Sequence, residues 1–152
     1  MSMSQRQAVK ICQQMDAAGL ELQMIGGNSL CTAVCRDNAG DAANGWYAIA
    51  DWTSEVSTPN GRAFEDAYQE AYGATSDYIS ATCYDAILLF KEACEIAGTT
   101  TDRKAINDAL TQINNFEGVM TTYNYQENHC LASDQMLVQN QDGLAVMIGT
   151  VE

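Results

Sequence analysis

Basic residues are scarce in this sequence, and their scarcity excludes one class of partner. Seven Lys and Arg stand against 20 Asp and Glu, which gives a formal net charge of -13 over 152 residues. The phosphate backbone of a nucleic acid, or an anionic membrane surface, would repel such a chain. We therefore expect no nucleic-acid partner.

Histidine occurs once, at His129, and this leaves little material for metal or catalytic chemistry. A zinc site takes four N, S or O ligands, and neither Cys31 with Cys35 nor His129 with Cys130 has a recognised spacing. A cysteine nucleophile needs a base within hydrogen-bond reach, and His129 is the sole imidazole. The glycines fit neither the dinucleotide-binding fingerprint nor a phosphate loop. We predict no metal, no cofactor, no catalytic residue and no enzymatic activity.

Long hydrophobic runs are also absent. No stretch approaches the ~20 apolar residues that cross a bilayer, and residues 1–6 lead into no apolar signal segment. Apolar residues make up 47% of the chain, which is enough to bury a core, so we expect a globular protein. The six cysteines lack the spacing of a small disulfide scaffold, and we expect free, buried thiols.

The first third of the chain follows an α/β pattern. Helical spacing of apolar residues after a serine cap predicts a helix over residues 4–18. A short apolar run over residues 20–25, closed by Gly26-Gly27, predicts a buried strand that ends in a tight turn. A short helix over residues 29–36 and a second strand over residues 46–51 follow.

The remaining two thirds of the chain predict helices and then strands. The helix over residues 78–97 is apolar on more than one face, so we expect neighbours to cover it on two sides. Asp142-Gly143 is a strong hairpin signal because both residues tolerate positive φ in a short turn. The predicted elements are helices over residues 59–72, 78–97 and 102–113, a strand over residues 119–125, and a hairpin over residues 136–140 and 144–148.

A series of short motifs runs through the chain in a fixed order. The most informative is Tyr84-Asp85-Ala86, which opens a long apolar helix that stops at Ala97-Gly98. The others are Ala17-Ala18-Gly19-Leu20, Met24-Ile25-Gly26-Gly27, Gly40-Asp41-Ala42-Ala43-Asn44-Gly45-Trp46-Tyr47 and Phe116-Glu117-Gly118-Val119. In this order the series resembles the branched-chain amino acid (Leu/Ile/Val) binding proteins, the type I periplasmic solute receptors of ABC transporters. The resemblance covers nearly the whole chain but matches only the later, C-terminal part of such a receptor.

This resemblance implies an incomplete α/β fold of the periplasmic-binding-protein-like I class, with Rossmann-like layers and a C-terminal β-hairpin. It implies part of the C-terminal lobe over residues 1–50, part of the N-terminal lobe over residues 51–123, and returning strands of the C-terminal lobe over residues 124–152. Each lobe would then lack its leading strands. Because unpaired strand edges and uncovered apolar faces invite association, we expect a homodimer.

The resemblance also implies a function. It makes the chain a fragment of an extracytoplasmic receptor, periplasmic or at the cell surface, that binds an amino acid or a related small molecule and passes it to the permease of an ABC importer. We expect the export signal to belong to a front part of the parent protein. The alternative is a shortened receptor-like α/β protein that acts as a structural or interaction module and binds no solute.

Five residues are candidates for holding the solute. Open α/β sheets bind ligands beyond the carboxyl ends of their strands, and Asn28 and Ser29 follow the first predicted strand at such an end. Trp52 lies where the chain of the resembled family crosses between lobes. Tyr78, or its neighbour Ile79, lies where that family often places an apolar or aromatic contact. The alternative is that these side chains simply pack at the ends of strands and helices.

Asn28 departs from the resembled family, in which an acid that pairs with the ammonium group of the ligand usually occupies this place. An Asn carbonyl accepts a hydrogen bond from an ammonium group, but it lacks the charge that makes such a bond roughly twice as strong. Either the solute is not a free α-amino acid, or Asn28 is only a turn residue. Tyr84 and Asp85 are expected to be structural, the acid being favoured by the helix dipole.

Overall fold

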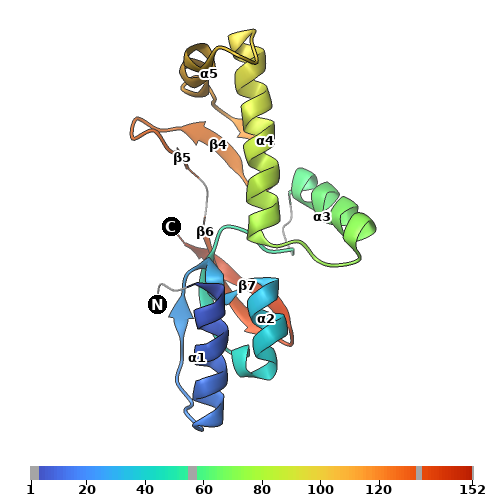
Figure 1. The fold of residues 1–152 in the computed structure, drawn as a ribbon, viewed down its shortest axis with the longest axis vertical. Helices are drawn as coiled ribbons and strands as arrows, with labels where there is room; N and C mark the ends of the chain where they lie inside the picture. Colours follow the sequence, from blue (N-terminus) through green and yellow to red (C-terminus); the bar gives the residue numbers. More distant parts are fainter. Residues whose placement is uncertain (1–3, 55–57, 133–134, 152) are drawn as a thin grey trace.

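The computed structural model describes residues 4–54, 58–132 and 135–151. Within these ranges the chain forms two units that follow one another along the long axis of the molecule (Figure 1). We call residues 4–54 and 135–151 the sheet unit, because they hold a four-stranded sheet, and residues 58–132 the helix unit.

In the sheet unit, two helices cover a mixed sheet of strand order β1-β2-β6-β7. Strands β1 and β2 are parallel, whereas β2 with β6 and β6 with β7 are antiparallel. Its core contains Ala8 and Cys12 of α1, Cys35 of α2 and Val138 of β6, all fully buried. The elements are α1 (Gln5–Ala17), β1 (Ile25–Gly26), α2 (Ala33–Ala39), β2 (Tyr47–Ala50), β6 (Gln135–Gln141), β7 (Leu144–Val151) and the 3-10 helices η1 (Asn28–Leu30) and η2 (Gly40–Ala43).

The helix predicted over residues 4–18 is confirmed as α1, but the buried strand predicted over residues 20–25 is wrong. Only the end of that run enters β1, and the side chains of Leu20 and Leu22 are 54% and 60% exposed. The reason is topological, because β1 is the edge strand and the run that leads into it lies at the rim of the sheet. The helix predicted over residues 29–36 is divided into η1 and α2.

The helix unit contains three helices and a small antiparallel sheet of order β3-β4-β5. Leu89 and Ala93 of α4, Ile106 of α5 and Tyr123 of β4 form one buried cluster. The helices predicted over residues 59–72 and 78–97 are confirmed with the same bounds. The elements are α3 (Pro59–Tyr72), α4 (Tyr78–Ala97), α5 (Arg103–Leu110), β3 (Phe116–Glu117), β4 (Thr122–Tyr125) and β5 (Leu131–Ala132).

Asp85 fixes the segment that precedes β4. Its carboxylate is 1% exposed and accepts hydrogen bonds from the backbone N of Val119 at 2.6 Å, the backbone N of Met120 at 2.9 Å and the hydroxyl of Tyr123 at 2.9 Å. Asp85 is therefore structural, as expected, but it acts by holding a loop rather than through the helix dipole. The same bonds explain why the strand predicted over residues 119–125 begins only at residue 122.

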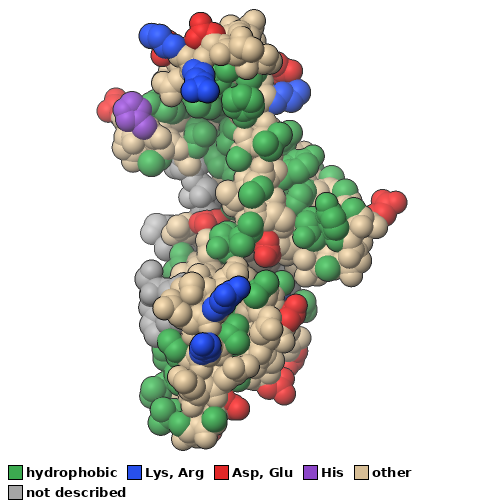
Figure 2. All heavy atoms as spheres, in the orientation of Figure 1, with side chains coloured by type: hydrophobic (Ala, Val, Ile, Leu, Met, Phe, Trp, Pro, Cys, Tyr) green, Lys and Arg blue, Asp and Glu red, His purple; other side chains and the backbone are tan. Residues whose placement is uncertain are grey.

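Helix α4 is less covered than its sequence predicts. Ile87 is 68% exposed and Phe90 is 50% exposed, so the coverage expected on two sides is not provided by the described residues. Figure 2 shows hydrophobic side chains along this helix on the visible face. Helix α4 thus leaves an apolar face exposed among the described residues.

The C-terminal hairpin is confirmed as β6 and β7, joined through Asp142 at φ 49° and Gly143 at φ 82°. All six cysteines are free, but Cys83 and Cys130 are exposed, contrary to the expected burial. Among the described helices, none combines the length and the apolar character that crossing a bilayer requires.

Candidate functional site

The parallel strands β1 and β2 end side by side, and this brings two polar side chains together at the carboxyl edge of the sheet. Gly26 pairs with Ala48, so the chain leaves β1 at η1 close to the point where it leaves β2 at Asp51. The Nδ2 atom of Asn28 donates to Oδ2 of Asp51 at 2.6 Å, and the backbone N of Asp51 donates to Oδ1 of Asn28 at 3.2 Å. Asn28 therefore ties the two strand ends to each other.

Trp52 lies at the junction of the two units and is 2% exposed. Its Nε1 donates to Oγ of Ser76 at 2.9 Å. Its ring meets Phe64 of α3 edge to face, with the ring centroids 5.8 Å apart. The indole is thus fixed by residues of the helix unit although it follows directly from a strand of the sheet unit.

A small cavity of about 10 Å³ lies between the two units. Both units contribute to its lining, Cys31 and Arg36 from the sheet unit and Asp77 and Tyr78 from the helix unit, together with Trp52. A space of this size holds about one water molecule. The two units are therefore closed upon each other at this point.

The sequence-predicted site residues divide into two sets. Trp52 and Tyr78 line the cavity, and Asn28 is bonded to Asp51 beside it. Ser29 is half-buried, and its carbonyl accepts from the hydroxyl of Thr32 at 3.5 Å, whereas the side chain of Ile79 is 44% exposed. Neither Ser29 nor Ile79 belongs to the cavity lining.

The charged groups around this cavity influence one another. Arg36 donates through Nε to the carbonyl of Gly143 at 2.7 Å and through Nη1 to the carbonyl of Cys31, and burial lowers its pKa. Burial raises the pKa of the Cys31 thiol to about 12. Burial, and then the negative charges of Asp77 and of groups near it, raises the pKa of Tyr78. At neutral pH the thiol and the phenol are therefore protonated donors.

Sequence reasoning missed Asp51 and Arg36 as members of this site. Asp51 could have been predicted from the sequence, because it is the last residue of a predicted strand and ligands of open α/β sheets bind beyond such strand ends. Arg36 gave none, since its position depends on the packing of α2 against the hairpin turn at Gly143. Across the described ranges, no three His, Cys, Asp or Glu side chains form a group suited to a metal ion.

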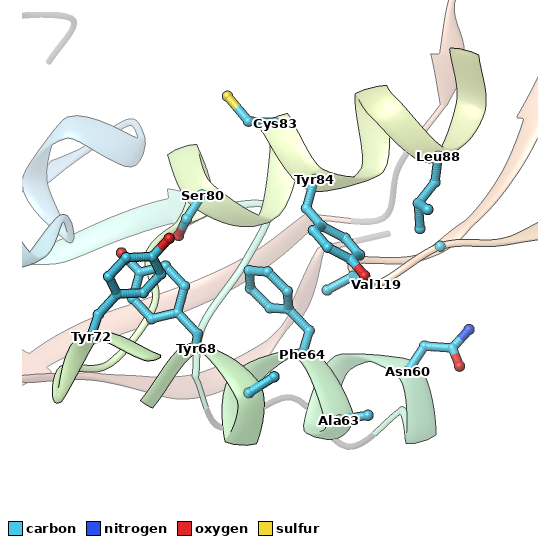
Figure 3. A pocket seen from close by; sticks show the side chains of 12 residues that line it. Asn60, Ala63, Phe64, Tyr68, Tyr72, Ser80, Cys83, Tyr84, Leu88 and Val119 are labelled. Atoms are coloured by element: carbon cyan, nitrogen blue, oxygen red, sulfur yellow. The ribbon is translucent and has the colours of Figure 1, made fainter. Parts of the chain in front are cut away.

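A second, larger hollow lies outside this site, between α3 and α4 (Figure 3). It is an apolar groove of about 700 Å³. The ring of Phe64 lies 5.0 Å from Tyr84 and 5.8 Å from Tyr68, and Tyr68 lies 4.7 Å from Tyr72. We call this feature the aromatic groove; its residues are Asn60, Ala63, Phe64, Ala67, Tyr68, Tyr72, Ser80, Cys83, Tyr84, Leu88, Gly118 and Val119.

The family follows from comparison with known proteins. A family model described as periplasmic binding protein matches residues 1–143. The chain belongs to the periplasmic binding protein family. This match includes every described helix and every described strand except β7, and therefore elements of both units.

Solved structures of periplasmic binding proteins confirm the α/β fold. A leucine binding protein, LivK, from Thermotoga maritima is 21% identical with a TM-score of 0.89, over 98% of this chain and 43% of its own. A branched-chain amino acid binding protein, LivJ, from Streptococcus pneumoniae, solved with isoleucine, is 22% identical with a TM-score of 0.84, over 97% of this chain and 43% of its own. A comparison with curated proteins gives no match.

A third similar structure widens the range of bound solutes. It is an ABC transporter solute binding protein from R. palustris in complex with benzoate, 22% identical with a TM-score of 0.88, over 98% of this chain and 41% of its own. The present chain therefore spans well under half the length of each of these receptors, and its sheet is a partial version of the periplasmic binding protein fold.

Proposed function

We propose that this chain is the later portion of an extracytoplasmic solute-binding receptor for amino acids or related small molecules. The receptor passes its solute to the permease of an ABC importer, and it binds without chemical conversion. Support comes from the family match over residues 1–143 and from similar structures described as binding leucine, isoleucine or benzoate.

The two units correspond in this proposal to parts of two receptor lobes. Residues 1–50 belong to the C-terminal lobe and residues 51–123 to the N-terminal lobe, and residues 124–152 return to the C-terminal lobe. Because β5 pairs with β4, we draw the return later than residue 124, after Ala132. The chain thus passes between the lobes twice, once after β2 and once before β6.

The observation that carries the proposal is the carboxyl edge of the parallel pair β1 and β2. Asn28 and Asp51 meet there, and Trp52 and Tyr78 line the adjoining cavity from two sides. Ligands of open α/β sheets bind at such an edge. The cavity is too small for an amino acid, so the units separate when solute enters and close upon it, as hinged receptors do. Ser29 and Ile79 are neighbours of these residues along the chain, and we include them in the proposed binding region.

A thermal-shift screen tests this proposal. Leucine, isoleucine, their amides and benzoate are each added to the full chain, and a ligand at a hundred times its dissociation constant should stabilise it by ~2.7 kcal/mol. Replacing Tyr78 by Ala should reduce that shift. Replacing the 71% exposed Tyr72 by Ala is the matched control and should leave it unchanged.

The second candidate function is a structural or interaction module that binds no solute. Two observations favour it, the small size of the cavity and the absence of an acid at position 28. The same screen separates the two functions. If no amino acid, amide or carboxylate shifts the melting temperature, the proposal of solute binding is wrong and the function as a structural or interaction module is retained.

We further propose that the chain associates with a second copy of itself. The aromatic groove is open, and the neighbouring face of α4 exposes Ile87 and Phe90. In a complete receptor, the front part of the polypeptide is available to cover such faces. Two copies of this chain carry the same apolar surface, so a symmetric dimer can bury the surface of one copy against that of the other.

A further inference from the structure

We propose that Cys12 of α1 and Cys35 of α2 form a disulfide bond when the chain meets a disulfide oxidant. The structure holds the pair in its reduced state, because all six cysteines are free. The inference rests on the proposed function only for its extracytoplasmic location, where compartments are oxidising. It assigns a covalent modification site to two residues that solute binding does not use.

The packing of two helices brings the two cysteines together. Helices α1 and α2 lie side by side (Figure 1), and Cys12 and Cys35 are buried in one cluster, at 1% and 0% exposure. One turn away on each helix lies a buried alanine, Ala8 on α1 and Ala39 on α2, and such small side chains favour close approach. Packed helix axes lie about 8–10 Å apart with a Cα radius of about 2.3 Å, which brings facing Cα atoms into the range of roughly 4.4–6.8 Å that a disulfide spans.

The two thiols also contact each other. A hydrogen bond between them raises the pKa of Cys12, and burial raises it further. The same bond lowers the pKa of Cys35, burial opposes this shift, and the positive charge of Arg36 adds to it. Cys35 therefore carries the thiolate character of the pair, and the thiolate is the form that attacks a disulfide.

The other cysteines are placed elsewhere. Cys31, one turn before Cys35 in the sequence, donates through Sγ to the carbonyl of Asn28 at 3.2 Å and lines the small cavity between the units. The remaining three cysteines belong to the helix unit. The pairing for which the fold is arranged is thus Cys12 with Cys35.

A hollow at the surface gives a route to the pair. Cys12 belongs to the lining of a hollow of about 410 Å³, together with Met15, Leu22 and Trp46. Leu22 is 60% exposed and lies in the run that leads into the edge strand β1. Displacement of this run opens the hollow toward the two sulfurs. Because both thiols are buried, the reaction in the folded chain depends on such local opening.

The oxidant is an external disulfide, carried by a small molecule such as glutathione disulfide or by a protein. The thiolate of Cys35 attacks one of its sulfurs, the external S–S bond breaks, and one external thiolate leaves. The charge of Cys35, which raises the pKa of Cys12, is thereby removed. Cys12 then loses its proton to the external thiolate, attacks the Cys35 sulfur of the mixed disulfide and releases the second external sulfur. This sulfur takes up the proton that Cys35 had lost, so two protein thiols are oxidised and one external disulfide is reduced to two thiols.

Peptide mapping of the full chain tests the pairing. The purified chain is incubated with glutathione disulfide, its remaining thiols are blocked with iodoacetamide in denaturant, and it is digested without reductant by trypsin and a glutamate-specific protease. Trypsin alone leaves residues 11–36 as one peptide, whereas cleavage after Glu21 separates Cys12 from Cys35. We expect the two halves to stay joined through Cys12 and Cys35, with Cys31 carrying the blocking group.

Thermal unfolding gives a second readout. A bridge from residue 12 to residue 35 restricts the unfolded chain, so reduction of the oxidised protein should lower its melting temperature by about 5–15 °C. Cys83→Ser, at an exposed position, is the matched control and should keep both the bridge and this difference. Cys12→Ser should abolish both. The comparison of the oxidised with the reduced unsubstituted chain needs no variant, so poor folding of Cys12→Ser does not prevent a decision.

The outcomes separate this bridge from solute binding. If Cys12 and Cys35 both carry the blocking group, if either retains glutathione, or if a bridge joins a different pair, the disulfide is wrong while solute binding stands. If the bridge forms but no ligand of the thermal-shift screen stabilises either the oxidised or the reduced chain, the disulfide stands and the proposed function is wrong.

Discussion

At the scale of single residues, a buried acid, Asp85, joins α4 to the segment before β4. Asp85 accepts two backbone N–H groups and the hydroxyl of Tyr123, and none of these donors is exposed. A buried donor left without a partner costs about 1–3 kcal/mol, so the acid stabilises the loop chiefly by preventing that loss. The aromatic-Asp-Ala motif thus records a tertiary contact between α4 and the residues before β4.

The bond between Tyr123 and Asp85 predicts a dependence of stability on pH. Burial, and then the charge of Asp85, raises the pKa of Tyr123 above its ordinary value of 10. The folded chain therefore holds the phenol proton more strongly than the unfolded chain does. This stabilisation is complete below pH 10 and declines as the pH rises further.

Tyr123→Phe should lower the free energy of unfolding by about 1.5–3 kcal/mol at pH 7, because a hydrogen bond to a charged group is lost. The difference between the two proteins should shrink above pH 10. Urea unfolding at pH 7, 9 and 11 measures it, with Tyr47→Phe on β2 as the control. A difference that stays constant up to pH 11 would contradict the argument.

The sequence predicted some residues near the candidate site and missed others for a physical reason. Asn28 and Trp52 follow recognisable strand ends, and the structure bonds Asn28 to Asp51 and Trp52 to Ser76 of the helix unit. Arg36 reaches the cavity only because α2 packs near the hairpin turn, which is 107 residues away along the chain. No local pattern encodes such a contact. The role of all five candidates in binding stays a prediction.

At the scale of elements, the link between α3 and α4 is held by a buried polar network. Glu65 of α3, 6% exposed, accepts from the backbone N and the hydroxyl of Ser76, and from Nε2 of Gln69 at 2.8 Å. Ser76 in turn accepts from Nε1 of Trp52. The network joins α3, the link before α4 and the segment after β2, so it sets how the two units meet.

Removing the hydroxyl of Ser76, which lies at the centre of this network, should lower the free energy of unfolding. Ser76→Ala leaves the indole N–H of Trp52 without its acceptor, and we expect a loss of about 1–3 kcal/mol in the free energy of unfolding. Thr100→Ala, at an exposed position after α4, should change stability by less than about 0.5 kcal/mol. Chemical denaturation followed by tryptophan fluorescence measures both. Equal stability of the two variants would show that the network contributes nothing.

The elements that the sequence predicted well are those whose ends are encoded locally. α4 begins after Asp77, which accepts from the backbone N of Ile79 and of Ser80, and it ends at Gly98 in the left-handed region. The strand predicted over residues 46–51 is confirmed as β2, but the two-residue strands were predicted poorly, because their extent depends on a partner strand. β3, which covers only Phe116–Glu117, exists through its pairing with β4 and was not predicted.

At the scale of the whole molecule, each unit has a buried cluster of its own, and a third cluster joins Trp52 of the sheet unit to Ala81, Val119 and Met120 of the helix unit. Apolar side chains nevertheless remain exposed. The core of the sheet unit contains no residue of the helix unit. Beside the helix-unit cores lie the aromatic groove and the exposed face of α4. Sequence periodicity predicted that α4 is covered on two sides, and the apolar pattern is present, but the described residues leave Ile87 and Phe90 exposed.

The proposed homodimer gives a direct prediction at this scale. Light scattering at increasing concentration should show a dimer. Ile87→Lys, at a 68% exposed position on α4, should weaken dimerisation by about tenfold or more if this face is the interface. Gln14→Lys on α1 adds the same charge at an exposed site and should have no effect. A compact monomer at every concentration would refute the proposal.

Gly118 lies so close to the hydrogen-bonded pair Asp85 and Tyr123 that these neighbours limit which residues can replace it. A methyl group at this glycine would lie 2.7 Å from Oδ2 of Asp85 and 2.6 Å from Cε2 of Tyr123. A larger residue at position 118 therefore requires Asp85 or Tyr123 to move, which would disturb the hydrogen bond between them. We expect substitutions at these three positions to be coupled in distant members of the family, and an alignment would show them as co-varying columns.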